Sequence, residues 1–76
     1  MKFPIFRVHS NRKHYYKIHS DRSFTEVQLI GKKAFIHEIN AQTYFEILRI
    51  QEMIELNHGY QESAEKDFEK ILNEKT

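Results

Sequence analysis

Four of the five histidines in this 76-residue chain lie in its N-terminal half, and imidazole is the commonest transition-metal ligand in proteins. His9 and His14 are spaced to meet across a short hairpin. His19 lies an odd number of residues from His14 and projects from the other face of a strand, and His37 stands apart in the sequence. Cysteine is absent and no carboxylate completes a zinc ligand set beside the pair. We therefore expect surface histidines, with no metal site and no cofactor.

A carboxylate and an imidazole together can move a proton at neutral pH, and Glu26 and His37 fall opposite each other if residues 24–39 form a hairpin. A cross-strand ion pair is the interpretation that we favour. No serine stands in a nucleophile elbow, and two glycines are too few for a phosphate-binding loop. The sequence therefore predicts no catalytic residues and no enzymatic activity.

Charge is divided unevenly along the chain. Residues 1–37 hold eight Lys or Arg against two acids, whereas residues 38–76 hold four against nine. Basic side chains interleaved with aromatic rings are typical of single-strand nucleic-acid binding. The candidate contact residues are Arg12, Lys13, Tyr15, Lys17, Arg22, Lys32 and Lys33. The alternative, which we prefer, is that the rings belong to the core and their basic neighbours are solvated.

A β-sheet is the element that must position these side chains. Runs of β-forming residues predict four strands, over residues 3–9, 14–19, 24–30 and 33–39. A turn after His9 would place Arg7 opposite Tyr16 and Ile5 opposite Ile18. The first two strands are therefore expected to form a hairpin.

The second hairpin depends on its turn. Gly31 and Lys32 form a two-residue connection that would set Glu26 opposite His37. An alternative remains open here, because Ser23 and Glu26 also fit a capping box that starts a short helix ending at Gly31.

One long helix is predicted over residues 41–57, between Asn40 as N-cap and Gly59 as the residue that closes its end. At 100° per residue it carries two apolar stripes on roughly opposite sides. The first consists of Ile47, Ile50 and Ile54. The second consists of Ala41, Phe45, Leu48 and Leu56. A second helix, over residues 60–72, has an apolar arc on one side only.

The sequence therefore predicts a single α+β domain over residues 1–76, in which a four-stranded antiparallel β-meander is followed by two C-terminal antiparallel helices. Nothing near Met1 has the uninterrupted apolar run of a signal peptide or membrane span, so we expect a cytoplasmic location and no membrane contact.

The predicted function is protein interaction or self-association, because two apolar stripes exceed what so short a chain can bury. The expected partner is a second copy of the chain or another protein. The stripe of Ala41, Phe45, Leu48 and Leu56 is the predicted interface. Nucleic-acid binding through the basic, aromatic N-terminal sheet is the alternative, and a small-ligand role ranks third.

Overall fold

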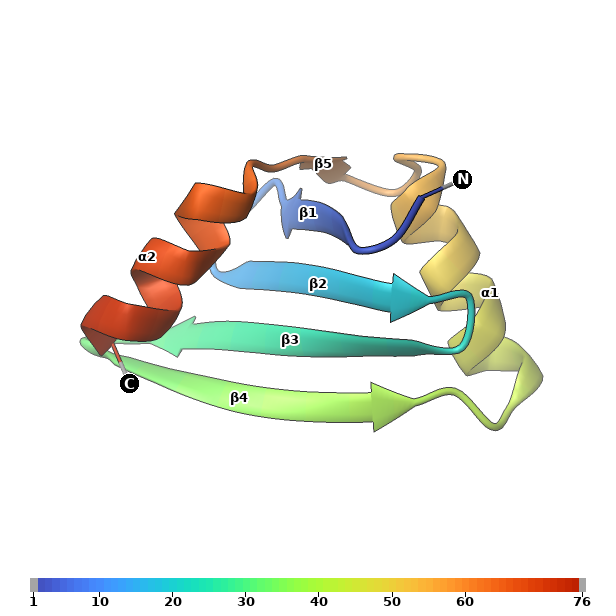
Figure 1. Ribbon diagram of the computed structural model, residues 1–76, viewed down its shortest axis with the longest axis horizontal. Coiled ribbons are helices and arrows are strands. Elements are labelled where there is room, and N and C mark those ends of the chain that lie inside the picture. The colour runs from blue at the N-terminus through green and yellow to red at the C-terminus, as the bar shows by residue number, and fades with distance from the viewer. Residues whose placement is uncertain (1, 76) are drawn as a thin grey trace.

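A five-stranded antiparallel sheet and two helices make up the fold (Figure 1). The computed structural model describes residues 2–75. The strands are β1 (Ile5–His9), β2 (His14–Ser20), β3 (Ser23–Ile30), β4 (Lys33–Asn40) and β5 (Tyr60–Glu62), and the helices are α1 (Tyr44–Ile54) and α2 (Glu65–Lys75). The spatial order of the strands is β4-β3-β2-β1-β5. The predicted α+β fold is confirmed, with the meander of β1 to β4 followed by two C-terminal helices.

Both predicted hairpins form in the predicted register. In the first, Arg7 pairs with Tyr16 and Ile5 with Ile18. In the second, Glu26 pairs with His37 across a turn in which Gly31 has a φ of +61°. A glycine with positive φ at the first turn position suits the twist of a two-residue hairpin. Residues 23–30 are strand β3, so the short helix considered for them is wrong.

The start of α1 differs from the prediction. Thr43, not Asn40, is the N-cap, and with Glu46 it forms a capping box. The Thr43 hydroxyl accepts from the Glu46 amide at 3.3 Å, while the Glu46 carboxylate accepts from the amides of Gln42 (2.9 Å) and Thr43 (3.1 Å). Asn40 cannot serve as N-cap because it is the last residue of β4. The helix therefore starts after a short loop that leaves the sheet.

A residue from another element bonds the carbonyls at the end of α1. Arg7 on β1 donates from Nε to the carbonyl of Met53 (2.9 Å) and from Nη2 to the carbonyl of Ile54 (3.1 Å). A cation at the negative end of the helix satisfies carbonyls that have no partner within the helix. The helix ends at Ile54, because the backbone becomes left-handed at Leu56 with a φ of +62°, and Gly59 closes the following loop with a φ of +87°.

Residues 60–64 do not begin the second helix as predicted. Tyr60–Glu62 form β5, which pairs with β1, and α2 starts at Glu65. The Ser10 amide donates to the Gly59 carbonyl at 2.8 Å and ties the entry of β5 to the sheet. Pairing with β1 therefore makes these residues a strand, although their apolar spacing also fits a helix.

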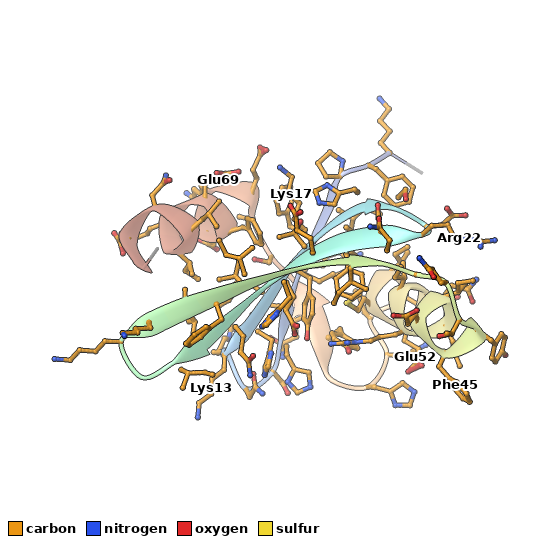
Figure 2. The ribbon with its side chains drawn as sticks, turned by 90° about the horizontal axis from the view of Figure 1, so that it is seen from below. Lys13, Lys17, Arg22, Phe45, Glu52 and Glu69 are labelled. Carbon is orange, nitrogen blue, oxygen red and sulfur yellow. The ribbon has the colours of Figure 1, made fainter. Side chains whose placement is uncertain are left out.

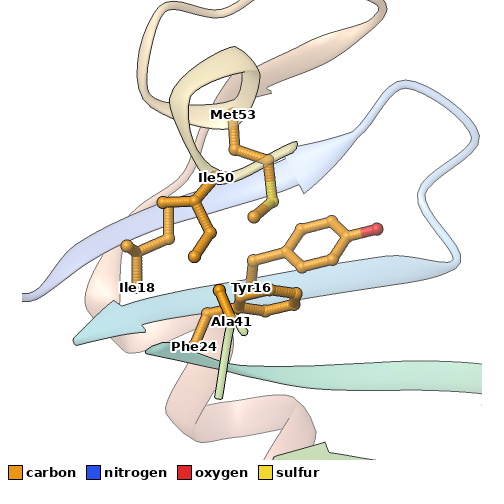
Figure 3. Close-up of a cluster of buried hydrophobic side chains, with 6 residues drawn as sticks. All are labelled: Tyr16, Ile18, Phe24, Ala41, Ile50 and Met53. Atoms are coloured by element: carbon orange, nitrogen blue, oxygen red, sulfur yellow. The ribbon is translucent and has the colours of Figure 1, made fainter. Parts of the chain in front are cut away.

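The two helices cover opposite faces of the sheet at opposite ends, so they are not the packed antiparallel neighbours that we expected (Figures 1 and 2). The main core cluster lies between α1 and the sheet (Figure 3). It consists of the buried residues Tyr16, Ile18, Phe24, Ala41, Ile50 and Met53. On the α2 side, the ring of Phe68 packs against Phe6 with 5.7 Å between centroids, and Val8 and Val27 are buried. Each helix therefore covers only part of one face.

Candidate functional site

Strand β4 forms one edge of the sheet and is eight residues long. Within the part of the chain that the structure describes, it pairs with β3 alone. In a two-residue hairpin the pair beside the turn, here Ile30 and Lys33, exchanges both backbone hydrogen bonds, and such pairs then alternate along the strands. The amide of Ala41 follows the same alternation and donates to the Arg22 carbonyl at 2.6 Å. The backbone groups of Ala34, Ile36 and Glu38 therefore point away from the sheet.

Exposed apolar side chains gather along the same side of the molecule. Of the seven exposed large apolar side chains among the described residues, five lie on β4 or the segments that flank it: Ile30, Phe35, Ile36, Tyr44 and Phe45. Phe35 and Ile36 project from opposite faces of β4 because neighbours alternate along a strand. We refer to the outward backbone of β4 together with these five side chains as the β4 edge.

The four residues of the predicted interface stripe do not form one exposed surface in the fold. Ala41 is 8% exposed and belongs to the core, which corrects its assignment to an interface. Phe45 is 80% exposed and lies beside Tyr44, which is 71% exposed, with 6.0 Å between their rings. Leu48 is half-buried, and Leu56 is exposed but lies beyond the helix with a φ of +62°. The first stripe behaves as expected, because Ile50 is buried and both Ile47 and Ile54 pack against the core.

Glu26 lies at the centre of a polar cluster beside the main core. Its carboxylate accepts from Nδ1 of His14 at 3.0 Å and from Nη2 of Arg49 at 3.5 Å. Nη2 of Arg49 also donates to the Tyr16 hydroxyl at 3.3 Å, and its guanidinium lies 5.5 Å from the centre of the Phe24 ring. The cluster therefore joins β2, β3 and α1.

Burial and the neighbouring groups determine the protonation state of the Tyr16 phenol in this cluster. Burial raises the pKa of Tyr16, and the nearby charge of Glu26 adds to the rise, against a lowering by the hydrogen bond from Arg49. The phenol is thus protonated at neutral pH. Glu26 itself is 8% exposed, and its carboxylate is bonded to His14 and Arg49.

The predicted ion pair of Glu26 with His37 is wrong, although the register that suggested it is confirmed. The carboxylate turns instead to His14, which is diagonal to it on the other neighbouring strand, and to Arg49. The two predicted hairpins did not contain this signal, because it depends on the register of β2 with β3, which sets His14 and Glu26 diagonally on one face. Arg49 was not predictable in this role because its helix had no assigned position over the sheet.

The candidate nucleic-acid contacts are divided among three places. Arg12 and Lys13 follow β1, and Lys32 and Lys33 follow β3, so these four lie at the same end of the sheet (Figure 1). Arg22 lies in the turn at the opposite end. Lys17 and Tyr15 lie on the face covered by α2, where the Lys17 ammonium sits 5.9 Å from the centre of the Phe6 ring (Figure 2).

Comparison with models of known protein families, with characterised proteins and with solved structures finds no match to this chain. Over the described residues, no three His, Asp or Glu side chains lie close enough to hold a metal ion together, and the rings of His9 and His14 are 6.3 Å apart. No helix in the described part of the chain is long and apolar enough to cross a membrane.

Proposed function

We propose that this chain is a self-association module in which the β4 edges of two copies pair antiparallel to form one continuous sheet. The observation that carries the proposal is the coincidence of an unpaired eight-residue edge strand with most of the exposed apolar side chains. Long, apolar, unprotected edge strands are rare in proteins that remain monomeric, because they are templates for pairing with another chain.

The backbone alternation favours a two-fold axis near Ile36. Pairing about this residue would let the outward amides and carbonyls of Ala34, Ile36 and Glu38 bond to those of the partner. It would also set Phe35 of one copy beside His37 of the other, because directly opposite residues share a face. Each of these outward backbone amides and carbonyls, which have no partner strand in the monomer, would thus gain one.

Charge favours the antiparallel arrangement over a parallel one. Lys33 stands at the start of β4 and Glu38 near its end. A parallel pair in register would set each Lys33 beside its own copy and each Glu38 beside its own copy, each pair on one face, whereas the antiparallel pair keeps these like charges apart. The same arrangement brings Tyr44 and Phe45, which follow β4, toward Ile30 at the start of the partner's turn.

Sedimentation equilibrium of the unmodified protein and of Ile36→Lys tests the proposal. We expect the mass of two chains for the unmodified protein and of one chain for Ile36→Lys, because a lysine at the centre of the pair repels its own copy. The matched control is Gln61→Lys, which puts the same charge on the exposed edge strand β5 and should leave the mass unchanged. A one-chain mass for the unmodified protein at every concentration, or an unchanged mass for Ile36→Lys, would contradict the proposal.

A further inference from the structure

The sheet face that carries α1 is open at the end away from the helix. The helix covers the end where Ile18 and Phe24 are buried, whereas Phe35, near the other end, is exposed (Figures 1 and 3). Strand alternation and the observed registers place His14 and Gln28 on the same face as Phe35. We call this region the open face.

Two basic turns border the open face. The amide of Leu29 donates to the Lys13 carbonyl at 2.7 Å, which fixes the turn after β1 beside the end of β3. Lys32 and Lys33 follow Leu29 within a few residues, so both turns lie side by side at this end of the sheet. The cations of the two turns, all exposed, are Arg12, Lys13, Lys32 and Lys33. Lys13 projects on the same side of the sheet as α1 (Figure 2).

Glu26, the carboxylate of β3 on this face, does not cancel this positive charge. Glu26 is almost buried and is already bonded to His14 and Arg49. The acidic residues of α1 lie at the other end of the sheet, and α2, which carries acidic residues at this end, lies on the opposite face. An exposed aromatic ring therefore lies toward the same end of the sheet as four cations that have no ion pair among the described residues.

We propose that the open face binds single-stranded nucleic acid. The cations of the two turns contact successive phosphates, and an unpaired base stacks on the ring of Phe35. Backbone cations with an exposed ring suit a single strand, since a base within a duplex cannot reach the ring. Phe35 also belongs to the β4 edge, so binding and self-association are measured on the same samples.

The position of the cations gives the site a measurable signature. Neutralising about four phosphates on a single strand makes the logarithm of the association constant fall with the logarithm of salt concentration, at a slope of about −3. Lys17 and Arg22 contribute nothing to this slope, because one lies under α2 on the other face and the other lies at the far end.

Fluorescence anisotropy with labelled oligouridine and oligodeoxythymidine tests the site. The double variant Lys13→Glu with Lys32→Glu should lose at least about tenfold in affinity, while Lys17→Glu with Arg22→Glu, which changes net charge equally, should retain the affinity of the unmodified protein. Phe35→Ala should lose about fivefold or more through stacking. Circular dichroism of each variant checks that it is folded.

Three results would overturn the proposal. The first is no binding at low salt. The second is an equal loss in both charge variants, which would indicate diffuse attraction to any polyanion. The third is unchanged affinity in Phe35→Ala together with equal binding of duplex, which would remove the role of an unpaired base. Sedimentation of the same variants separates this site from the β4 edge, because the Lys13→Glu and Lys32→Glu changes lie outside the proposed interface centre and should leave the mass unchanged.

Discussion

Glu26 shows how a single buried carboxylate can fix the position of a helix over a sheet. It stands on β3, its partner His14 stands on β2, and its partner Arg49 reaches down from α1. Arg49 also lies over the rings of Tyr16 and Phe24, at 5.7 and 5.5 Å from their centres. Removing the charge therefore weakens contacts between three elements at once.

We predict that Glu26→Gln lowers the free energy of unfolding by about 1–3 kcal/mol, since hydrogen bonds to charged groups contribute about that much. Urea unfolding followed by circular dichroism measures the change. The control Glu65→Gln, at an exposed position on α2, should stay within about 0.5 kcal/mol. Equal effects of the two substitutions would show that the cluster contributes little to stability.

At the scale of elements, α1 depends on a capping box whose carboxylate is exposed. Hydrogen bonds from the amides of Gln42 and Thr43 lower the pKa of Glu46 from its ordinary value of 4.5. A lowered folded-state pKa contributes stability that is fully present above 4.5 and is lost as the pH falls through the folded value.

We therefore predict that the stability difference between the unmodified protein and Glu46→Gln is constant above pH 4.5 and shrinks below it. Chemical denaturation over a series of pH values measures this difference. The glutamine keeps an amide oxygen that can accept the same bonds, so the comparison isolates the charge. A difference that persists unchanged into the acidic range would contradict the assigned role of the carboxylate.

The elements of this fold differ in how far the sequence predicts them. Both hairpins and their registers were predictable, because a two-residue turn at Gly31 and the alternation of apolar residues leave one pairing that buries a consistent face. Strand β5 was not, because three residues carry too short a pattern and their pairing with β1 is decided by tertiary hydrogen bonds. The N-cap was misplaced by three positions because Asn40 suits a cap chemically while its backbone belongs to β4.

The candidate sites were predictable only in part. Phe45 is exposed and its role as an interface residue stays a prediction, whereas Ala41 lies in the core, where its amide continues the pairing of β4 by donating to the Arg22 carbonyl. The basic residues were recognisable by type, but their division between two faces and two ends follows from strand order and helix placement. Helical periodicity does not reveal that an edge strand is left unpaired.

On the scale of the whole molecule, the two edges of the sheet are unlike each other. One edge is β5, a strand of three residues, and short edge strands are a common protection against unwanted pairing. The other is β4, with eight residues and exposed apolar side chains on both faces. This asymmetry favours pairing at one side only, and a single isologous contact gives a closed dimer, not a filament.

Amide hydrogen exchange at β4, followed by NMR over a series of protein concentrations, tests this pairing most directly. The amides of Ile36 and Glu38 point outward from the edge, whereas those of Phe35 and His37 bond to β3 by the hairpin alternation. If two β4 edges pair, exchange at Ile36 and Glu38 should slow as concentration rises, while Phe35 and His37 remain protected throughout. Rapid exchange at Ile36 and Glu38 at concentrations where the protein has the mass of two chains would place the interface elsewhere and contradict pairing through β4.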